Sequence, residues 1–178
     1  MFELTNKVAV ITGGGSGIGQ AIALLFAKHG AQTVVLDVDG DAATATVNSI
    51  SQTGGRAISF SCDVSKAAEV RKVFHTVHSE LERIDILVNN AGIAHVGTVA
   101  NTSEEDFDRI YNVNVKGVFL CSKAAIGIML RQKKGVILNL ASIVSCIGVP
   151  DRFAYTMSKG AVLTMTRSIA VDLSLIHI

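Results

Sequence analysis

Short apolar runs alternate along the chain with longer segments whose apolar residues recur every three or four positions. A short β-branched run predicts a strand buried on both faces, and the longer spacing predicts an amphipathic helix. The short runs predict strands at Lys7–Thr12, Thr33–Asp37, Ala57–Cys62, Ile84–Asn89 and Val136–Ala141. The periodic segments predict helices at Gly17–His29, Asp41–Gln52, Lys66–Leu81, Ser103–Arg131 (bent near Gly117) and Phe153–Leu173.

This alternation of strands and helices predicts right-handed β-α-β units and one parallel sheet covered by helices on both faces. The chain shows no repeat, low-complexity tract or linker, and Pro150 is its only proline. Residues 1–178 are accordingly expected to form a single α/β domain.

Composition narrows the class of protein. Hydrophobic residues make up 49% of the 178 positions and charged residues 17%, which argues against disorder, and a net charge of +1 argues against nucleic-acid binding. The three cysteines (Cys62, Cys121 and Cys146) show no CxxC spacing, so neither a disulfide framework nor a metal site is expected. We also expect no signal peptide, no membrane span and a cytoplasmic location.

A glycine-rich segment, Thr12–Gly19, joins the first predicted strand to the first predicted helix. Glycine lets the backbone turn sharply and approach a ligand closely, and the helix that follows offers free N–H groups and a positive dipole end. Glycine-rich turns are common, but this strand-loop-helix context favours a nucleotide site. The expected contacts come from Gly13, Gly15, Ser16, Gly17, Ile18 and Gly19.

Asp37 ends the second predicted strand, eighteen positions after Gly19. A carboxylate at this place accepts hydrogen bonds from ribose hydroxyls and repels a 2′-phosphate. No Arg or Lys lies in the glycine segment or next to Asp37 to offset that repulsion. The sequence therefore favours NAD over NADP, with a simple polar turn at Asp37 as the alternative.

Four polar residues suggest reactive chemistry. Tyr155 and Lys159 are four apart and share a helix face, and an ammonium beside a phenol favours the phenolate form needed for general acid-base catalysis. Ser142 lies just past the fifth predicted strand, at the carboxyl edge where parallel sheets bind ligands. Asn114 is polar in an otherwise apolar helix face. Taken singly, YxxxK is common by chance and Asn114 has a structural interpretation.

The motifs together resemble the short-chain dehydrogenase/reductase family. The glycine segment matches its TGxxxGxG pattern, Asn89–Gly92 matches NNAG, and Ser142 precedes the YxxxK motif by the usual thirteen positions to Tyr155. The resemblance covers residues 4 to about 173. It implies a Rossmann-like doubly wound parallel sheet with strand order 3-2-1-4-5.

The resemblance also implies roles for the reactive residues. Tyr155 would be the catalytic acid/base, and Lys159 would favour its phenolate and hold the nicotinamide ribose. Ser142 would polarise the substrate oxygen. Asn114 would anchor a water that links Lys159 to solvent.

Further cofactor contacts are implied by the same family pattern. Asp63 and Val64 match the pair that contacts adenine. The residues after the fourth strand would line the cofactor, namely Asn90, Ala91 and Gly92, whereas Asn89 would brace the sheet. The implied partner is a small alcohol or ketone, and the implied assembly is a homodimer or homotetramer paired through the two long helices, Ser103–Arg131 and Phe153–Leu173.

The chain departs from the family pattern at two places. Ala141 replaces the first of two adjacent serines, which affects little because the second is the catalytic one. Members of about 250 residues continue with strands six and seven, which are missing here, so we interpret the chain as C-terminally truncated, with residues 174–178 as a non-native remnant. The fifth strand would then be an exposed edge, and little activity is expected.

The predicted function is NAD(P)-dependent hydride transfer to or from a secondary alcohol or ketone, such as a sugar, sugar acid, hydroxy acid or 3-oxoacyl group. The alternatives are a truncated NAD-binding fragment without turnover, a Rossmann-like methyltransferase and an extended family member acting on nucleotide sugars. His95, after the NNAG motif, and the pair Asp151 and Arg152 are candidates to approach a polar substrate, although a solvated loop is the favoured interpretation of all three.

Overall fold

A computed structural model describes residues 3–173 of the chain, so residues 174–178, which we interpreted as a non-native remnant, lie outside the described residues. The strands are β1 (Val8–Thr12), β2 (Gln32–Asp37), β3 (Arg56–Ser61), β4 (Ile86–Asn89) and β5 (Val136–Asn139). The α-helices are α1 (Gly17–Lys28), α2 (Gly40–Gln52), α3 (Ala67–Leu81), α4 (Glu104–Tyr111), α5 (Gly117–Gln132) and α6 (Phe153–Leu173). Two short helical segments are η1 (Asn112–Lys116) and η2 (Ile143–Ser145).

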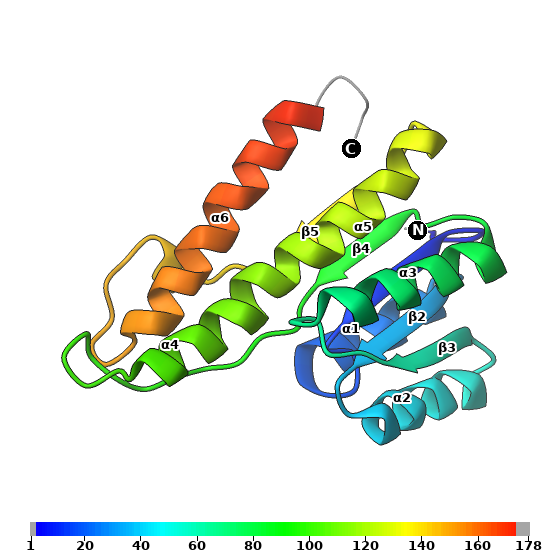
Figure 1. Ribbon diagram of the computed structural model, residues 1–178. Helices are drawn as coiled ribbons and strands as arrows, with labels where there is room; N and C mark the ends of the chain where they lie inside the picture. The colour runs from blue at the N-terminus through cyan, green and yellow to red at the C-terminus, as the bar shows by residue number, and fades with distance from the viewer. Residues whose placement is uncertain (1–2, 174–178) are drawn as a thin grey trace.

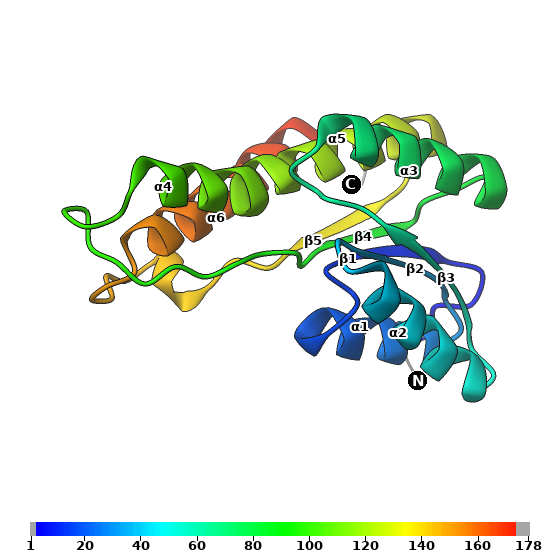
Figure 2. The same ribbon diagram turned by 60° about the horizontal axis from the view of Figure 1, so that its bottom comes forward.

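The five strands form one parallel sheet in the order β3-β2-β1-β4-β5, which confirms the predicted fold. Helices α1 and α2 cover one face, and α3 and α5 cover the other, with α6 beside α5 (Figures 1 and 2). The strand order reverses at the central β1, since β2 and β3 lie to one side of it and β4 and β5 to the other, so the topological switch point lies between β1 and β4. Sheets of this kind bind ligands at the carboxyl ends of the strands beside that switch point.

Consecutive residues of β2 show how the core forms. Val34 and Leu36 pack in the apolar cluster toward α3 and α5, and Val35 packs in the cluster toward α1 and α2. All three are fully buried, because side chains alternate across the strand and helices cover both faces. This is why the strands are apolar runs rather than alternating patterns.

Two strands end earlier than predicted. β3 ends at Ser61, although the N–H of Cys62 still donates to the carbonyl of Asp37 at 2.8 Å. β5 ends at Asn139 instead of Ala141, because a 3.1 Å bond from the Ala141 N–H to the Asn139 carbonyl turns the chain out of the ladder. Both corrections fall at the carboxyl edge of the sheet.

The long predicted helix is interrupted just before Gly117. Residues Asn112–Lys116 form a π-helical turn, so the expected bend is a local widening of the helix. The whole stretch Glu104–Gln132 is long and apolar enough to cross a membrane by length and composition alone. Half of its most apolar window is buried, and α5 packs on β4 and α3, as expected of a core helix.

Asp85 ties together the amino ends of three strands. Its carboxylate accepts the Val8 N–H at 2.9 Å, its own N–H donates to the Val8 carbonyl, and its carbonyl accepts the Val136 N–H. Arg83 binds the same carboxylate at 2.6 and 2.7 Å, and Lys7 lies 3.8 Å away. β4 therefore begins at Ile86, two residues later than predicted.

We expect Asp85→Asn to lower the free energy of unfolding by about 2 kcal/mol at pH 7, because a buried hydrogen-bonded ion pair loses its charge. Burial alone would raise the pKa of Asp85, but hydrogen bonds from Arg83 and Val8 outweigh it and lower the pKa. The stabilisation is therefore complete above the pKa of the unfolded carboxyl and is lost as the pH falls through the lower folded value.

Urea unfolding of the wild type and Asp85→Asn at pH 7 and pH 3 measures this effect. The difference between the two proteins should narrow at pH 3. Asp108→Asn, at an exposed position of α4, makes the same charge change and should have little effect at either pH. An Asp85→Asn difference that is equal at both pH values would contradict the assignment.

Candidate active site

A pocket of about 710 Å³ opens at the carboxyl edge of the sheet, beside the switch point between β1 and β4. Its lining comes from the end of β2, the loops after β1 to β5, the start of α1, and from α4, η1 and α6. Most predicted site residues line it: Gly13, Ser16, Gly17, Ile18, Asp37, Asp63, Val64, Asn90, Ala91, Gly92, Tyr155 and Lys159. The predicted residues outside the lining are Gly15, Gly19, Asn114 and Ser142.

The glycine loop is shaped by close backbone contacts. Gly13 and Gly17 have φ angles of +63° and +54°, which L side chains rarely adopt. A Cβ on Gly13 would lie 2.9 Å from the Cα of Ala91, and one on Gly19 would overlap the Gly13 carbonyl oxygen and the Asn90 amide nitrogen. The loop thus packs directly against the segment after β4 without side chains in between.

The start of α1 has free hydrogen-bond donors. Ser16 is the N-cap residue, and its side chain makes no capping bond. Ser16, Gly17 and Ile18 all line the pocket, so the first-turn N–H groups and the positive end of the helix face open space. A glycine cradle with free N–H groups fits the pyrophosphate of a dinucleotide.

Asp37 lines the pocket and also braces the glycine loop. Its Oδ2 accepts the Gly15 N–H at 2.9 Å, and its Oδ1 accepts the Asp39 N–H at 3.1 Å. A Cβ on Gly15 would lie 2.8 Å from the Cβ of Ala42 and 2.9 Å from Asp37 Oδ2. Gly15 therefore acts as a spacer that lets the loop reach the carboxylate, and its predicted contact with a ligand stays a prediction.

Asn90 locks the glycine loop to the end of β4. Its side-chain amide donates to the carbonyls of Thr12 and Gly13, both at 2.9 Å. In return the Thr12 hydroxyl accepts the N–H groups of Asn90 and Ala91, both at 3.0 Å. The two loops that line the pocket thus form one hydrogen-bonded unit.

Asn89 lies in the sheet and does not line the pocket. Its side-chain amide donates to the Ser122 hydroxyl at 3.0 Å and to Oδ1 of Asn139 at 2.8 Å. These contacts connect β4 to α5 and β5, which agrees with the predicted bracing role.

Asn114 lies buried within the π-helical turn. Its Oδ1 accepts the Ile93 N–H at 2.8 Å, and its Nδ2 donates to the Ile93 carbonyl at 2.9 Å and the Ser158 hydroxyl at 3.0 Å. Ser158 in turn donates to the Tyr155 carbonyl at 2.7 Å. Asn114 thereby connects the loop after β4 to the helix that carries Tyr155.

Lys159 reaches from α6 into the pocket, buried to 7% exposure. Its Nζ donates to the Leu140 carbonyl at 2.6 Å and lies 5.8 Å from the centre of the Tyr155 ring. Burial lowers the pKa of Lys159 below its usual value. Tyr155 and Lys159 thus share the pocket face of α6, as their spacing predicts.

Ser142 caps a short helix that the sequence did not predict. It is the N-cap residue of η2, where its Oγ accepts the Val144 N–H at 3.4 Å and its N–H donates to Ser145 Oγ at 3.3 Å. Its neighbour Ala141 lines the pocket, whereas Ser142 does not. The serine is therefore at the predicted edge of the sheet, next to the pocket wall.

The part of the lining that follows β3 is held by local contacts. Asp63 Oδ1 accepts the Ser65 N–H at 2.9 Å and the Ser65 hydroxyl at 2.7 Å. Val64 packs on Gly117, where a Cβ would lie only 2.8 Å from its side chain. Cys62 also lines the pocket, and burial raises the pKa of its thiol to about 11.

Several lining residues were not predicted from the sequence. Apart from Cys62, they are Val38, Ile93, Ala94, Arg109, Val113, Leu140 and Ala141. Some adjoin a predicted motif and could have been found by extending it, but Arg109 and Val113 come from the helical stretch and carry no motif. Within residues 3–173, no three His, Cys, Asp or Glu side chains gather as metal ligands.

Comparisons with known proteins agree with this architecture. The model of the family described as short chain dehydrogenase matches residues 7–178. An uncharacterized oxidoreductase of Thermotoga maritima is 48% identical over 94% of this chain and 66% of its own length. The chain thus spans about two thirds of the length of that curated relative.

Solved structures match equally well. An NAD⁺-bound xylitol dehydrogenase superposes with a TM-score of 0.96 at 34% identity, covering 99% of this chain and 68% of that one. A metagenomic short-chain oxidoreductase in complex with NADP gives a TM-score of 0.94 at 33% identity, covering 97% and 79%. The chain therefore belongs to the short chain dehydrogenase family of oxidoreductases.

Proposed function

We propose that this protein binds NAD in the carboxyl-edge pocket and uses Tyr155 as a general acid/base when hydride moves between the nicotinamide and a secondary alcohol or ketone. One observation carries the proposal: the glycine loop, Tyr155 and Lys159 line the same pocket. When bound, the nicotinamide supplies the hydride acceptor or donor. The residues of the chain bind, orient and move the proton.

Tyr155 exchanges the hydroxyl proton of the substrate during the reaction. Oxidation of an alcohol removes this proton as hydride leaves the carbon, and reduction of a ketone returns it. The Lys159 ammonium, 5.8 Å from the Tyr155 ring centre, favours negative charge on the phenol oxygen. Ser142 donates a hydrogen bond to the substrate oxygen, because its Oγ only accepts the Val144 N–H at 3.4 Å and its own O–H stays free to donate.

Asn114 is a positioning residue in this proposal. The side-chain hydrogen bonds of Asn114 go to the Ile93 backbone and to Ser158, whose hydroxyl donates to the Tyr155 carbonyl. It fixes the distance between the loop after β4 and the catalytic turn of α6. The water that the family resemblance assigns to Asn114 stays a prediction.

The alternative is an NAD-binding fragment without turnover. Both proposals predict NADH binding, and turnover with a panel of secondary alcohols and ketones separates them. The xylitol dehydrogenase likeness supports a polyol among the first substrates to test. The substrate class is to be identified by turnover with that panel of alcohols and ketones.

We expect NADH to bind more tightly than NADPH. Asp37→Asn should lower the ratio of the NADPH dissociation constant to the NADH dissociation constant by about tenfold, because it removes the charge that repels a 2′-phosphate. Asparagine keeps an acceptor for the Gly15 N–H, so the loop stays braced. Fluorescence titration with both cofactors measures the ratio.

Asp39→Asn is the matched control for this titration. Asp39 caps α2 by accepting the N–H groups of Asp41 and Ala42, which asparagine also does well, and it does not line the pocket. The ratio should stay within about twofold of the wild type. No NADH binding by the wild type would refute the proposed function, and an unchanged ratio in Asp37→Asn would refute the selectivity argument.

A further inference from the structure

Charged residues divide the pocket into two parts. The carboxylates of Asp37 and Asp63 lie on the β2 and β3 side, and the cations of the described lining are Arg109 on α4 and Lys159 on α6. Lys159 is buried and already donates to the Leu140 carbonyl. Arg109 differs because its side chain is about half exposed, at 52%, and carries a positive charge.

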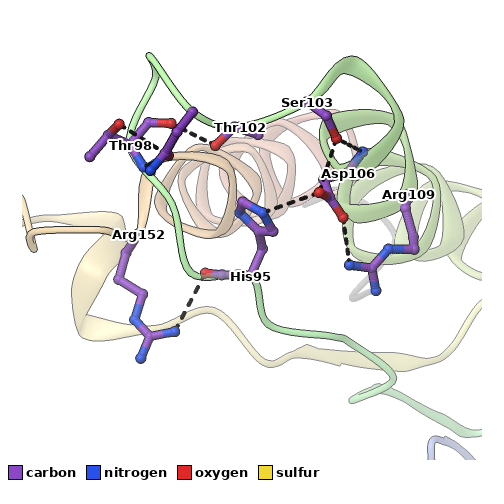
Figure 3. A network of polar contacts seen from close by, with 8 residues as sticks. His95, Thr98, Thr102, Ser103, Asp106, Arg109 and Arg152 are labelled. Atoms are coloured by element: carbon purple, nitrogen blue, oxygen red, sulfur yellow. Dashed lines mark hydrogen bonds and ion pairs between the residues drawn. The ribbon is translucent and has the colours of Figure 1, made fainter.

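Arg109 is held at the pocket by a carboxylate network. Figure 3 shows Asp106 between Arg109 and His95: its Oδ1 accepts Arg109 Nη2 at 2.9 Å, and His95 Nε2 lies 3.6 Å from its Oδ2. Ser103 Oγ donates to the same Oδ2 at 2.9 Å. Hydrogen bonds from Arg109 and Ser103 lower the pKa of Asp106, so the carboxylate stays ionised.

The network leaves most of the guanidinium available. Arginine has five N–H donors in its side chain, and the Nη2 bond to Asp106 is the one side-chain hydrogen bond of Arg109 within residues 3–173. Val113, one helical turn later on the same face, also lines the pocket. Arg109 is thus a partly anchored cation with free donors, on an element separate from the glycine loop.

We propose that Arg109 binds the pyrophosphate of the dinucleotide from the α4 side of the pocket. The proposal rests on the proposed function, since a dinucleotide must occupy the pocket. The glycine loop contributes neutral N–H groups, and Asp37 and Asp63 add negative charge to the same pocket. The positive end of α1 favours a pyrophosphate, and the guanidinium of Arg109 adds a full positive charge whose planar donors fit phosphate oxygens well.

Equilibrium binding tests the proposal without any need for turnover. NADH fluorescence titrations give the dissociation constants for the wild type, Arg109→Gln, Arg109→Lys and Arg131→Gln. ADP-ribose and adenosine are then measured by competition with NADH, because only the former carries a pyrophosphate. Arg131→Gln makes the same charge change near the far end of the same helical stretch, roughly 33 Å from Arg109.

The expected result is that Arg109→Gln weakens NADH and ADP-ribose by about tenfold and leaves adenosine unchanged. Arg109→Lys should stay within about threefold of the wild type, since it keeps the charge, and Arg131→Gln should match the wild type. Circular dichroism melting of all variants shows whether each remains folded.

Four outcomes would overturn the inference. If Arg109→Gln binds NADH as tightly as the wild type does, this inference is overturned while the proposed function stands. The same holds if Arg109→Gln weakens adenosine binding as much as NADH binding, which would indicate a disturbed pocket. Unchanged NADH binding with a raised KM for a carboxylate-bearing alcohol would assign the guanidinium to the substrate. A wild type that binds no NADH overturns the proposed function together with this inference.

Discussion

Tyr155→Phe should reduce turnover by a factor on the order of 10³ or more while leaving the NADH dissociation constant within about twofold of the wild type. The substitution removes one hydroxyl and keeps the ring that lines the pocket beside Lys159. The group that accepts the alcohol proton is lost, whereas the glycine loop and Lys159 remain available to bind the cofactor. Absorbance of NADH during alcohol oxidation gives the rate, and fluorescence titration gives the binding constant.

Tyr111→Phe is a matched control, because Tyr111 and Tyr155 are the two tyrosines of the chain. Tyr111 ends α4, is 44% exposed and does not line the pocket. Its loss of a hydroxyl should leave the rate unchanged. Full activity in Tyr155→Phe would refute the acid/base assignment, and a parallel loss of NADH binding would instead indicate a role in holding the pocket together.

The sheet was predictable because its signal is local. Val34, Val35 and Leu36 are apolar in succession, since β2 is covered on both faces, and the glycine segment marks the turn from β1 into α1. The order of the strands came from the family resemblance, whose motifs lie at strand ends. Tyr155 and Lys159 were also predictable as neighbours, because helical spacing fixes their common face.

Contacts between distant segments were not predictable in the same way. The π-helical turn at Asn112–Lys116 depends on Asn114 bonding to the backbone of Ile93, twenty-one positions earlier. In the sequence, Asp85 is one polar residue at the start of a predicted strand, and its role depends on Val8 of the neighbouring strand β1. Arg109 belongs to a charged helix end, and only the fold brings it to the pocket.

Bracing explains several residues that the motifs treat as ligand contacts. The side-chain amide of Asn90 donates to the Thr12 and Gly13 carbonyls, and the Asp37 carboxylate accepts the Gly15 N–H. These bonds keep the glycine loop in one shape before any ligand arrives. Preorganisation of this kind lowers the entropy lost on binding. The motif thus encodes the rigidity of the loop as much as its contacts.

Gly19→Ala should produce the largest structural effect of any single methyl group added to the loop. A Cβ at this position would overlap the Gly13 carbonyl oxygen and the Asn90 side-chain amide, and the Gly13 oxygen is backbone that cannot turn aside. We expect a loss of about 3 kcal/mol in the free energy of unfolding and more than about tenfold weaker NADH binding, because the Asn90 bonds to the loop must break. Urea unfolding and NADH titration measure the two effects.

Gly127→Ala provides the matched control, since it adds the same methyl group inside a helix. Gly127 lies in α5, and a Cβ there would meet nothing within 4 Å. Alanine favours the helix over glycine by about 1 kcal/mol, so stability should rise and NADH binding should not change. If Gly19→Ala behaved like Gly127→Ala, the close approach of α1 to the loop after β4 would not be what shapes the pocket. A destabilised Gly19→Ala with normal NADH binding would separate the packing of α1 from the cofactor site.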